Sequence, residues 1–252
     1  MLNSGLSKFA TLLVVGLAAT SAKADEAAQS VIITGGSDLA KDSETYYAGI
    51  LVALNRDFSR DGLIFRTYGN IGQYDYDTDS VASGNVNVDY RAFDVMLGYQ
   101  KSVGDITGTL YLGVDHQEHD DKPNDFESDL RGIETGFKIA GDIATGDETP
   151  LFVGADASYS TAFDTFESQL RVGYNMKWLV LGVEGAYYNV VSDDTERLGG
   201  FATFKFHASP NVPVELTLNG GHQFVSESDD GEGNSFSGGE GTYGGTNLSF
   251  SF

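Results

Sequence analysis

"TNLSFSF" (residues 246–252) ends the sequence, and its alternation of apolar and polar residues decides the fold. Successive side chains of an extended strand point to opposite faces, so Leu248, Phe250 and Phe252 share one face. The residues between them are Asn or Ser and share the other face. So clean an apolar face predicts that this end of the chain is held in an apolar medium. An aromatic last residue after alternating apolar ones is typical of the insertion signal of outer-membrane proteins, and we expect these three residues to form that signal.

The same period of two recurs along the whole chain. In "FDVMLGYQ" (93–100), for example, Phe, Val, Leu and Tyr alternate with Asp, Met, Gly and Gln. About twelve segments of this kind occur, each of about ten residues or slightly more, the length that a tilted strand needs to cross a bilayer. The expected strands are residues 29–37, 44–55, 62–76, 88–100, 106–117, 129–141, 151–162, 165–176, 178–190, 197–207, 214–225 and 241–252.

The connections between these strands are of two kinds. Every second one is acidic and often long, namely residues 77–85, 118–128, 192–196 and 226–241. Those between them are short or rich in turn residues, namely residues 101–105, the junction near Lys177 and residues 208–213. This asymmetry is typical of outer-membrane barrels. The sequence therefore predicts a closed antiparallel β-barrel in the outer membrane of a Gram-negative bacterium, in contact with its lipid. A secreted β-sandwich would also alternate, but it does not account for the terminal Phe252.

The other terminus has the layout of a secretory signal peptide. Lys8 precedes an apolar run at residues 9–19, and Ala22 and Ala24 form an A-x-A cleavage site. We therefore expect residues 1–24 to be a signal peptide and residues 25–252 to be the barrel domain. The alternative is a buried N-terminal helix. No other segment has an apolar run long enough for a transmembrane helix.

Composition narrows the class of protein further. The chain has no cysteine and a net charge of −22, which repels nucleic acid and argues against a DNA- or RNA-binding role. It holds 32 Gly, only 4 Pro, 13 Tyr and 16 Phe, a composition that suits half-polar strands better than disorder. Trp178 and several tyrosines fall near strand ends, where we expect them to form interface girdles. These are Tyr46, Tyr47, Tyr74, Tyr76, Tyr159, Tyr187 and Tyr188.

The polar strand faces carry charges of both signs, which a barrel would direct into its lumen. The expected lumen network is Arg66, Asp94, Glu134, Lys138, Asp156, Glu167, Arg171, Glu184 and Arg197, with Lys205 and Glu215 as further members. We expect Glu134, Lys138, Glu167 and Arg171 to lie within ion-pairing reach of opposite charges. Because both signs are interspersed, a narrow or filled lumen is favoured over an ion-selective pore, which would bias one sign.

No motif predicts a catalytic residue, a cofactor or a metal. "GEGTYG" (239–244) matches the dinucleotide fingerprint by letters but leads into a strand instead of a helix. His116 and His119 stand beside Asp120 and Asp121, a metal-binding combination that lacks a defined further ligand. The sequence contains no G-x-S-x-G segment and offers no serine opposite a histidine for a hydrolytic triad.

Several segments resemble the cellulose biosynthesis protein BcsS family of Gram-negative bacteria. The most recognisable is "YSTAFDT" (159–165), and residues 92–100, 110–125, 130–143, 196–204 and 213–224 are similar to family segments in the same order. The resemblance covers residues 44–225. It implies a part in cellulose or related exopolysaccharide production at the cell envelope, with cellulose or its synthesis and export machinery as partners. It implies no catalytic residue.

The resemblance favours a non-enzymatic accessory factor, and two alternatives remain open. One is a narrow diffusion channel for small solutes, and the other is an envelope enzyme acting on lipid or glycan. "YSTAFDT" itself has two interpretations. It is either a tight turn packed beneath longer loops or a contact site for polymer or partner, formed by Tyr159, Ser160, Thr161, Phe163 and Asp164.

Overall fold

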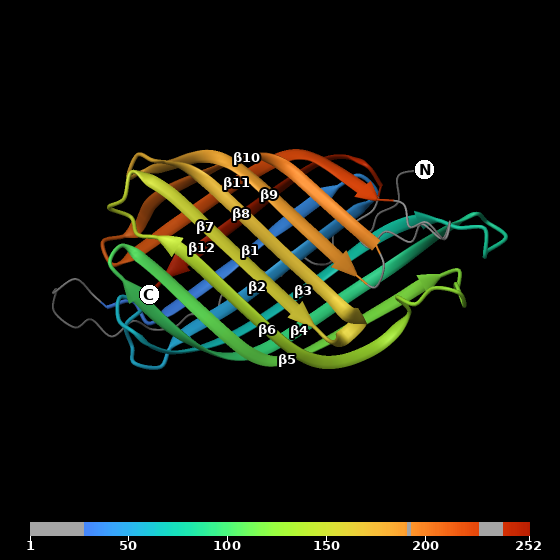
Figure 1. The fold of residues 1–252 in the computed structure, drawn as a ribbon, viewed down its shortest axis with the longest axis horizontal. Helices are drawn as coiled ribbons and strands as arrows, with labels where there is room; N and C mark the ends of the chain where they lie inside the picture. Colours follow the sequence, from blue (N-terminus) through green and yellow to red (C-terminus); the bar gives the residue numbers. More distant parts are fainter. Residues whose placement is uncertain (1–27, 191–192, 227–238) are drawn as a thin grey trace.

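Residues 28–190, 193–226 and 239–252 are described by this computed structural model, and they form one closed barrel of twelve antiparallel strands. Each strand pairs with its neighbours in sequence, and β1 pairs with β12 to close the barrel (Figure 1). The strands are β1 (Val31–Ala40), β2 (Ser43–Ala53), β3 (Gly62–Asp77), β4 (Asn85–Val103), β5 (Ile106–Lys122), β6 (Gly132–Thr145), β7 (Leu151–Ser160), β8 (Thr165–Asn175), β9 (Leu179–Val190), β10 (Asp193–Ser209), β11 (Val212–Ser226) and β12 (Gly241–Ser251).

The predicted all-β antiparallel barrel of about twelve strands is confirmed. The predicted signal peptide, residues 1–24, lies outside the described residues. A single 3-10 turn, η1 (Ala162–Asp164), interrupts the strands, and the described part of the chain has no helix long and apolar enough to cross a membrane.

Some strands extend further than predicted. β5 continues to Lys122 and β10 begins at Asp193, so much of two acidic segments expected as loops, 118–128 and 192–196, is strand. The ladder explains the extension, because Asp121 still pairs with Val88 in β4 and Glu196 with Tyr187 in β9. Acidic residues can still pair in a strand where the strand extends beyond the apolar part of the barrel surface. A run of acidic residues therefore indicates where that apolar surface ends, and it does not show where the strand ends.

We call the end of the barrel that holds Val31 and Phe252 the near end and the opposite end the far end. The far-end connections at residues 78–84 and 123–131 are long, as predicted, and the β3–β4 hairpin projects furthest there (Figure 1). The asymmetry is incomplete, however. The far-end turn at residues 41–42 is tight, whereas the near-end connection at residues 54–61 is longer than expected.

The outer surface is an apolar belt. Its exposed apolar side chains include Phe93, Leu97, Leu110, Leu112, Val114, Phe137, Ile139, Leu170, Leu181, Val183, Leu248 and Phe252. The belt has polar borders on β4 and β5, with the Arg91–Glu118 ion pair at 3.4 Å on the far side and Lys101, opposite Gly108, on the near side. Ten residues from Gly108 to Glu118, at about 3.4 Å each and tilted by about 40°, span about 26 Å. This height matches the apolar band of an outer-membrane barrel.

The interior is filled by apolar clusters at several levels. A near-end cluster joins Ala53, Ile64, Met96, Tyr111 and Ala140, with Phe58 of the connection 54–61 packed against it. A far-end cluster joins Tyr74, Tyr76, Val86, Val88 and Tyr90 on the projecting hairpin. A third cluster brings together Leu130, Phe163 and Val190. These clusters pack parts of the lumen at both ends of the barrel.

The predicted aromatic girdle agrees with the structure only in part. Tyr46 and Tyr159 face outward, and Trp178 is exposed at a near-end turn. The prediction was wrong for four other tyrosines, which face the interior: Tyr47, Tyr74, Tyr76 and Tyr188. A tyrosine suits both a membrane interface and a polar lumen, since its ring is apolar and its hydroxyl needs a hydrogen-bond partner. Position on the strand decides between the two.

If the belt contacts lipid, Leu112→Arg should be strongly destabilising. Leu112 is 62% exposed and lies between the polar borders of the belt, where an arginine costs about 2–4 kcal/mol. Unfolding in urea from phospholipid vesicles, followed by the fluorescence of Trp178, measures the loss. Val103→Arg is the matched control, because Val103 shares the outward face but lies at the near end of β4, where the expected cost is about 0–1 kcal/mol. Equal costs for the two variants would contradict the belt.

Candidate functional site in the barrel lumen

The charged residues predicted for the lumen occupy inward-facing positions of the strands. Eight of them line two interior cavities: Arg66, Asp94, Lys138, Asp156, Glu167, Arg171, Glu184 and Arg197. The ninth, Glu134, accepts a hydrogen bond from the backbone N–H of Phe163 at 2.8 Å. Lys205 and Glu215 line a third cavity, of about 620 Å³, at the near end.

Asp94 is the centre of the charge network. It is 3% exposed, and its Oδ2 lies 3.0 Å from an Arg66 nitrogen and 3.1 Å from Lys138 Nζ. Lys138 reaches Asp94 across the intervening strand β5, where Gly113 faces the lumen opposite both Met96 and Lys138. A side chain at Gly113 would have no room, because its Cβ would stand 2.1 Å from the Val95 carbonyl oxygen. Glycine at this position therefore allows the close approach of β5 to the backbone of β4 beside the ion pair.

The middle cavity, of about 320 Å³, surrounds this network and is acidic. Its lining contains the carboxylates of Asp94, Asp115, Asp142, Asp156 and Glu167 against the two cations Arg66 and Lys138. Hydrogen bonds offset part of this excess, since Gln117 Nε2 donates to Asp115 Oδ2 at 2.7 Å. The lumen is therefore mixed in sign, as predicted, but with more acids than bases at this level.

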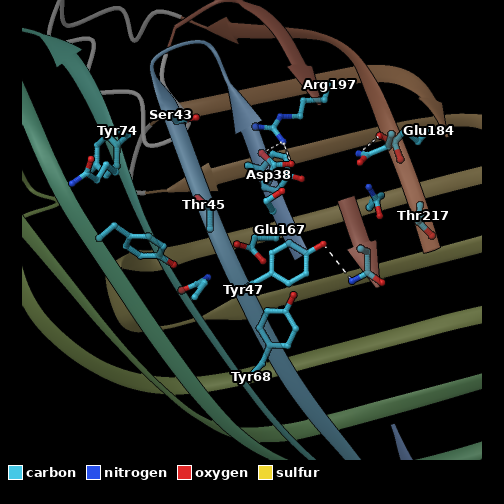
Figure 2. A pocket seen from close by; sticks show the side chains of 18 of the residues that line it. Asp38, Ser43, Thr45, Tyr47, Tyr68, Tyr74, Glu167, Glu184, Arg197 and Thr217 are labelled. Atoms are coloured by element: carbon cyan, nitrogen blue, oxygen red, sulfur yellow. Dashed lines mark hydrogen bonds and ion pairs between the residues drawn. The ribbon is translucent and has the colours of Figure 1, made fainter. Parts of the chain in front are cut away.

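The far cavity, of about 400 Å³, is organised by two further networks (Figure 2). Arg197 donates from one nitrogen to both carboxylate oxygens of Asp38, each at 2.8 Å. Glu184 Oε1 accepts hydrogen bonds from Asn219 at 2.7 Å and from Tyr243 at 2.8 Å. Asp38 was not among the predicted lumen residues because the first strand was expected to end at residue 37, whereas β1 continues to Ala40.

The expectation of ion pairs was wrong for three of the four residues named for it. Within the described residues, only Lys138 forms one, and no opposite charge lies within 4.0 Å of Glu134, Glu167 or Arg171. Arg171 stands opposite Glu184 in the β8–β9 register, but the partners of Glu184 lie on β11 and β12. The Arg171 guanidinium instead lies 5.7 Å from the ring centre of Phe201.

The "YSTAFDT" turn folds inward over the far end of the lumen. Phe163 is 4% exposed and packs edge-on against His119, with ring centres 4.8 Å apart. Phe163 and Asp164 have φ angles of 49° and 46°, in the left-handed region that residues other than glycine rarely adopt. Side chains hold this conformation, since Glu134 accepts from Phe163 N–H and Thr161 Oγ1 accepts from Phe137 N–H at 2.9 Å. Tyr159 donates to Asp164 on the exposed side.

Asp125 anchors the far-end loops and was missed by the sequence analysis. It is 1% exposed and accepts hydrogen bonds from Ser80 Oγ at 2.7 Å and Tyr76 Oη at 3.0 Å. Burial alone would raise the pKa of the Asp125 carboxyl, but these hydrogen bonds, with those from backbone N–H groups, hold its pKa below the usual value. The loop 123–131 is thereby tied to the connection 78–84. A lone Asp in an acidic loop gives no sequence signal of this role.

The candidate metal ligands are separated by the strand that carries them. His116 faces outward, where its Nδ1 lies 2.8 Å from Thr135 Oγ1, whereas His119 is buried in the lumen. The two imidazoles therefore cannot share an ion. The described residues include no group of three or more His, Cys, Asp or Glu side chains placed to hold a metal.

A closed antiparallel barrel with an apolar outer belt and a charged lumen is the architecture of an outer-membrane barrel protein. The sequence pattern of the cellulose biosynthesis protein BcsS family matches residues 32–252, and the chain belongs to this family. The resemblance found in the sequence is thus confirmed. No curated protein matches the chain.

Solved structures of outer-membrane proteins are similar to this chain at low identity. A KdgM porin in complex with disordered oligogalacturonate has a TM-score of 0.46 and 12% identity, over 88% of this chain and 99% of that chain. Outer membrane phospholipase A from Escherichia coli has a TM-score of 0.39 and 14% identity, over 88% and 91%. The outer membrane protein OpdK from Pseudomonas aeruginosa has a TM-score of 0.35 and 10% identity, over 89% and 97%. At these values no ligand or activity transfers to this chain.

Asp94→Asn should destabilise the barrel strongly. The change keeps the side-chain shape but leaves Arg66 and Lys138 without their shared anion, and breaking a buried ion pair costs about 3–5 kcal/mol. Urea unfolding in phospholipid vesicles measures the change in free energy.

Asp89→Asn is the matched control for this experiment. Asp89 pairs with Lys122, whose side chain is 55% exposed, and exposed pairs contribute about 1 kcal/mol or less. A loss for Asp94→Asn no larger than that for the control would show that the Asp94 network does not hold the lumen together.

Proposed function

We propose that the protein resides in the outer membrane of a Gram-negative bacterium and acts there, without catalysing a reaction, as an accessory factor in cellulose synthesis or export. Family membership supports the link to cellulose biosynthesis. The apolar belt of about 26 Å, closed around the whole barrel, supports the membrane location. An apolar surface of this extent on a water-soluble monomer would promote aggregation.

The interior supports an accessory role better than free diffusion of solutes. The near-end cluster around Ile64 and the inward turn at Phe163 occupy the lumen from the two ends. Buried ion pairs such as that of Asp94 with Lys138 crowd the space between them. A barrel with this interior conducts little, and its contribution to cellulose production then lies in binding or positioning.

A narrow channel is the second candidate function, and the cavities favour it. The far and middle cavities share Tyr68, Asn70, Tyr90 and Glu167 in their linings, so they lie next to each other inside the barrel. The third cavity lies at the near end of the barrel, where residues of β10 and β11 line it. If the protein is a channel, solutes pass along these cavities.

Deletion of the gene should reduce or mislocalise cellulose and leave growth and outer-membrane permeability nearly unchanged. The physical reason is that the near-end cluster, the inward turn at Phe163 and the Asp94 network obstruct the lumen and leave little solute flux, so its loss does not starve the cell. Cellulose staining and quantification, together with uptake of small dyes, measure the two effects. Normal cellulose with impaired uptake of a small solute would favour the channel and end the accessory proposal.

We propose that "YSTAFDT" is mainly a structural turn, and Phe163→Ala tests this. Removing a buried ring costs about 3–5 kcal/mol, so barrel assembly, read as heat-resistant folding on gels, should fall together with cellulose output. Asp164→Asn is the control, because the Asp164 side chain contacts Tyr159 on the exposed side of the turn and asparagine tolerates the left-handed backbone of this position. It should leave both readouts intact. A normally folded Asp164→Asn barrel with lost cellulose would instead identify the turn as a contact site.

A further inference from the structure

The far cavity has an aromatic wall. Tyr47 on β2 and Tyr68 on β3 stack with ring centres 5.7 Å apart, and Figure 2 shows both rings extending into the cavity. Tyr188 on β9 lines the same cavity, with the Arg197 guanidinium 5.1 Å from its ring centre. A tyrosine offers a flat apolar face and a polar edge. The C–H face of a β-linked pyranose ring is flat and apolar in the same way, so such rings stack on such walls.

Hydrogen-bonding groups with spare capacity face this wall. Glu167 and Gln169 on β8 line the cavity, and neither side chain hydrogen-bonds or ion-pairs with another residue in the part of the chain that the structure describes. Thr217 and Asn219 on β11 line it as well. Carboxylate and amide oxygens accept hydrogen bonds from hydroxyl groups, and amide nitrogens donate to them. The cavity thus combines flat apolar surfaces with free acceptors, the two features that a polyhydroxylated ring needs.

The charge of the cavity disfavours anions. Its lining holds the carboxylates of Asp38, Glu167 and Glu184 against the guanidinium groups of Arg171 and Arg197. Asp38 and Arg197 neutralise each other through their 2.8 Å contacts. The remaining lining carries one negative charge in excess. This net charge favours a neutral sugar over a uronic acid or a phosphate, even though Arg171 has no carboxylate partner in the part of the chain that the structure describes.

Size and continuity favour a chain over a single small molecule. About 400 Å³ falls within the range of about 300–1,000 Å³ that small-ligand sites occupy. The middle cavity adds about 320 Å³ and shares Tyr68 and Glu167 with the lining of the far cavity. A linear ligand of several sugar rings that occupies the far cavity therefore has further space beside it, toward the middle of the barrel.

We propose that the far cavity is a binding site for a neutral β-linked oligosaccharide, in the form of a short stretch of glucan chain. Its pyranose rings stack on Tyr47 and Tyr68, and its hydroxyl groups bond to Glu167 and Gln169. The choice of a β-glucan among neutral saccharides rests on the proposed function in cellulose production. The cavity itself, with its tyrosine rings and free acceptors, supports a saccharide site, and this support does not depend on the proposed function.

Calorimetric titration of the full-length, folded barrel in detergent with cellotetraose tests the site. We expect saturable binding that Tyr68→Ala and Glu167→Ala each weaken about tenfold or more, the loss expected for one strong contact. Gln169→Ala is a further variant, should the loss of the Tyr68 ring prevent folding. Tyr46→Ala is the matched control, because Tyr46 adjoins Tyr47 but faces outward and is 48% exposed. It should leave the affinity unchanged within about twofold.

Three results would overturn the proposal: no binding of cellotetraose to the folded wild-type barrel, unchanged affinity in all the cavity variants, or tighter binding of tetragalacturonate than of cellotetraose. The deletion strain separates this failure from that of the proposed function. Absent binding with reduced cellulose in the deletion strain refutes the cavity site alone. Binding that depends on Tyr68 and Glu167, with normal cellulose in the deletion strain, supports the saccharide site and refutes the accessory role.

Discussion

Strict alternation of side chains between the outer belt and the lumen is the constraint on which the rest of the structure depends. Because the period is two, a slip of one residue in pairing exchanges the faces of a strand. On β4 such a slip would move the Asp94 carboxylate into the apolar belt and Leu97 into the lumen. Asp94 also joins β3 to β6 through Arg66 and Lys138. The buried charges and the apolar belt therefore specify the strand register together.

The barrel interior is divided between support and open space. The near-end cluster draws its buried residues from β2 to β6, and the far-end cluster draws them from β3 and β4. The far cavity is lined by β1 to β4 and by β8 to β12, and Tyr74 and Tyr90 of the far-end cluster belong to its wall. Packed clusters and open cavities thus share the same strands. Residues such as Glu167 and Gln169, which line the far cavity outside the clusters, are the positions where a change can alter binding at small cost in stability.

Alternation in the sequence was sufficient to predict the strands, their faces and the charged character of the lumen. It identifies the face of a side chain but not its neighbour across the barrel, so the pairing of Asp38 with Arg197, 159 positions apart, could not be predicted. The same limit explains why Glu167 and Arg171 were assigned ion pairs that they do not form. Tyr47 was misplaced because tyrosine suits both environments. What the sequence lacks is the curvature of the closed sheet, which sets distances across the lumen.

The β1–β12 pairing has a consequence for the order of assembly. It joins Ile32 to Ser251, more than two hundred positions apart, whereas every other strand pair is a local hairpin. Local hairpins form early, and contacts between distant residues form late. Until the two strands meet, the growing sheet has two open edges that can pair with other chains. We therefore expect closure to be the final step, and an incomplete chain to remain an open sheet whose edges must be shielded from other strands.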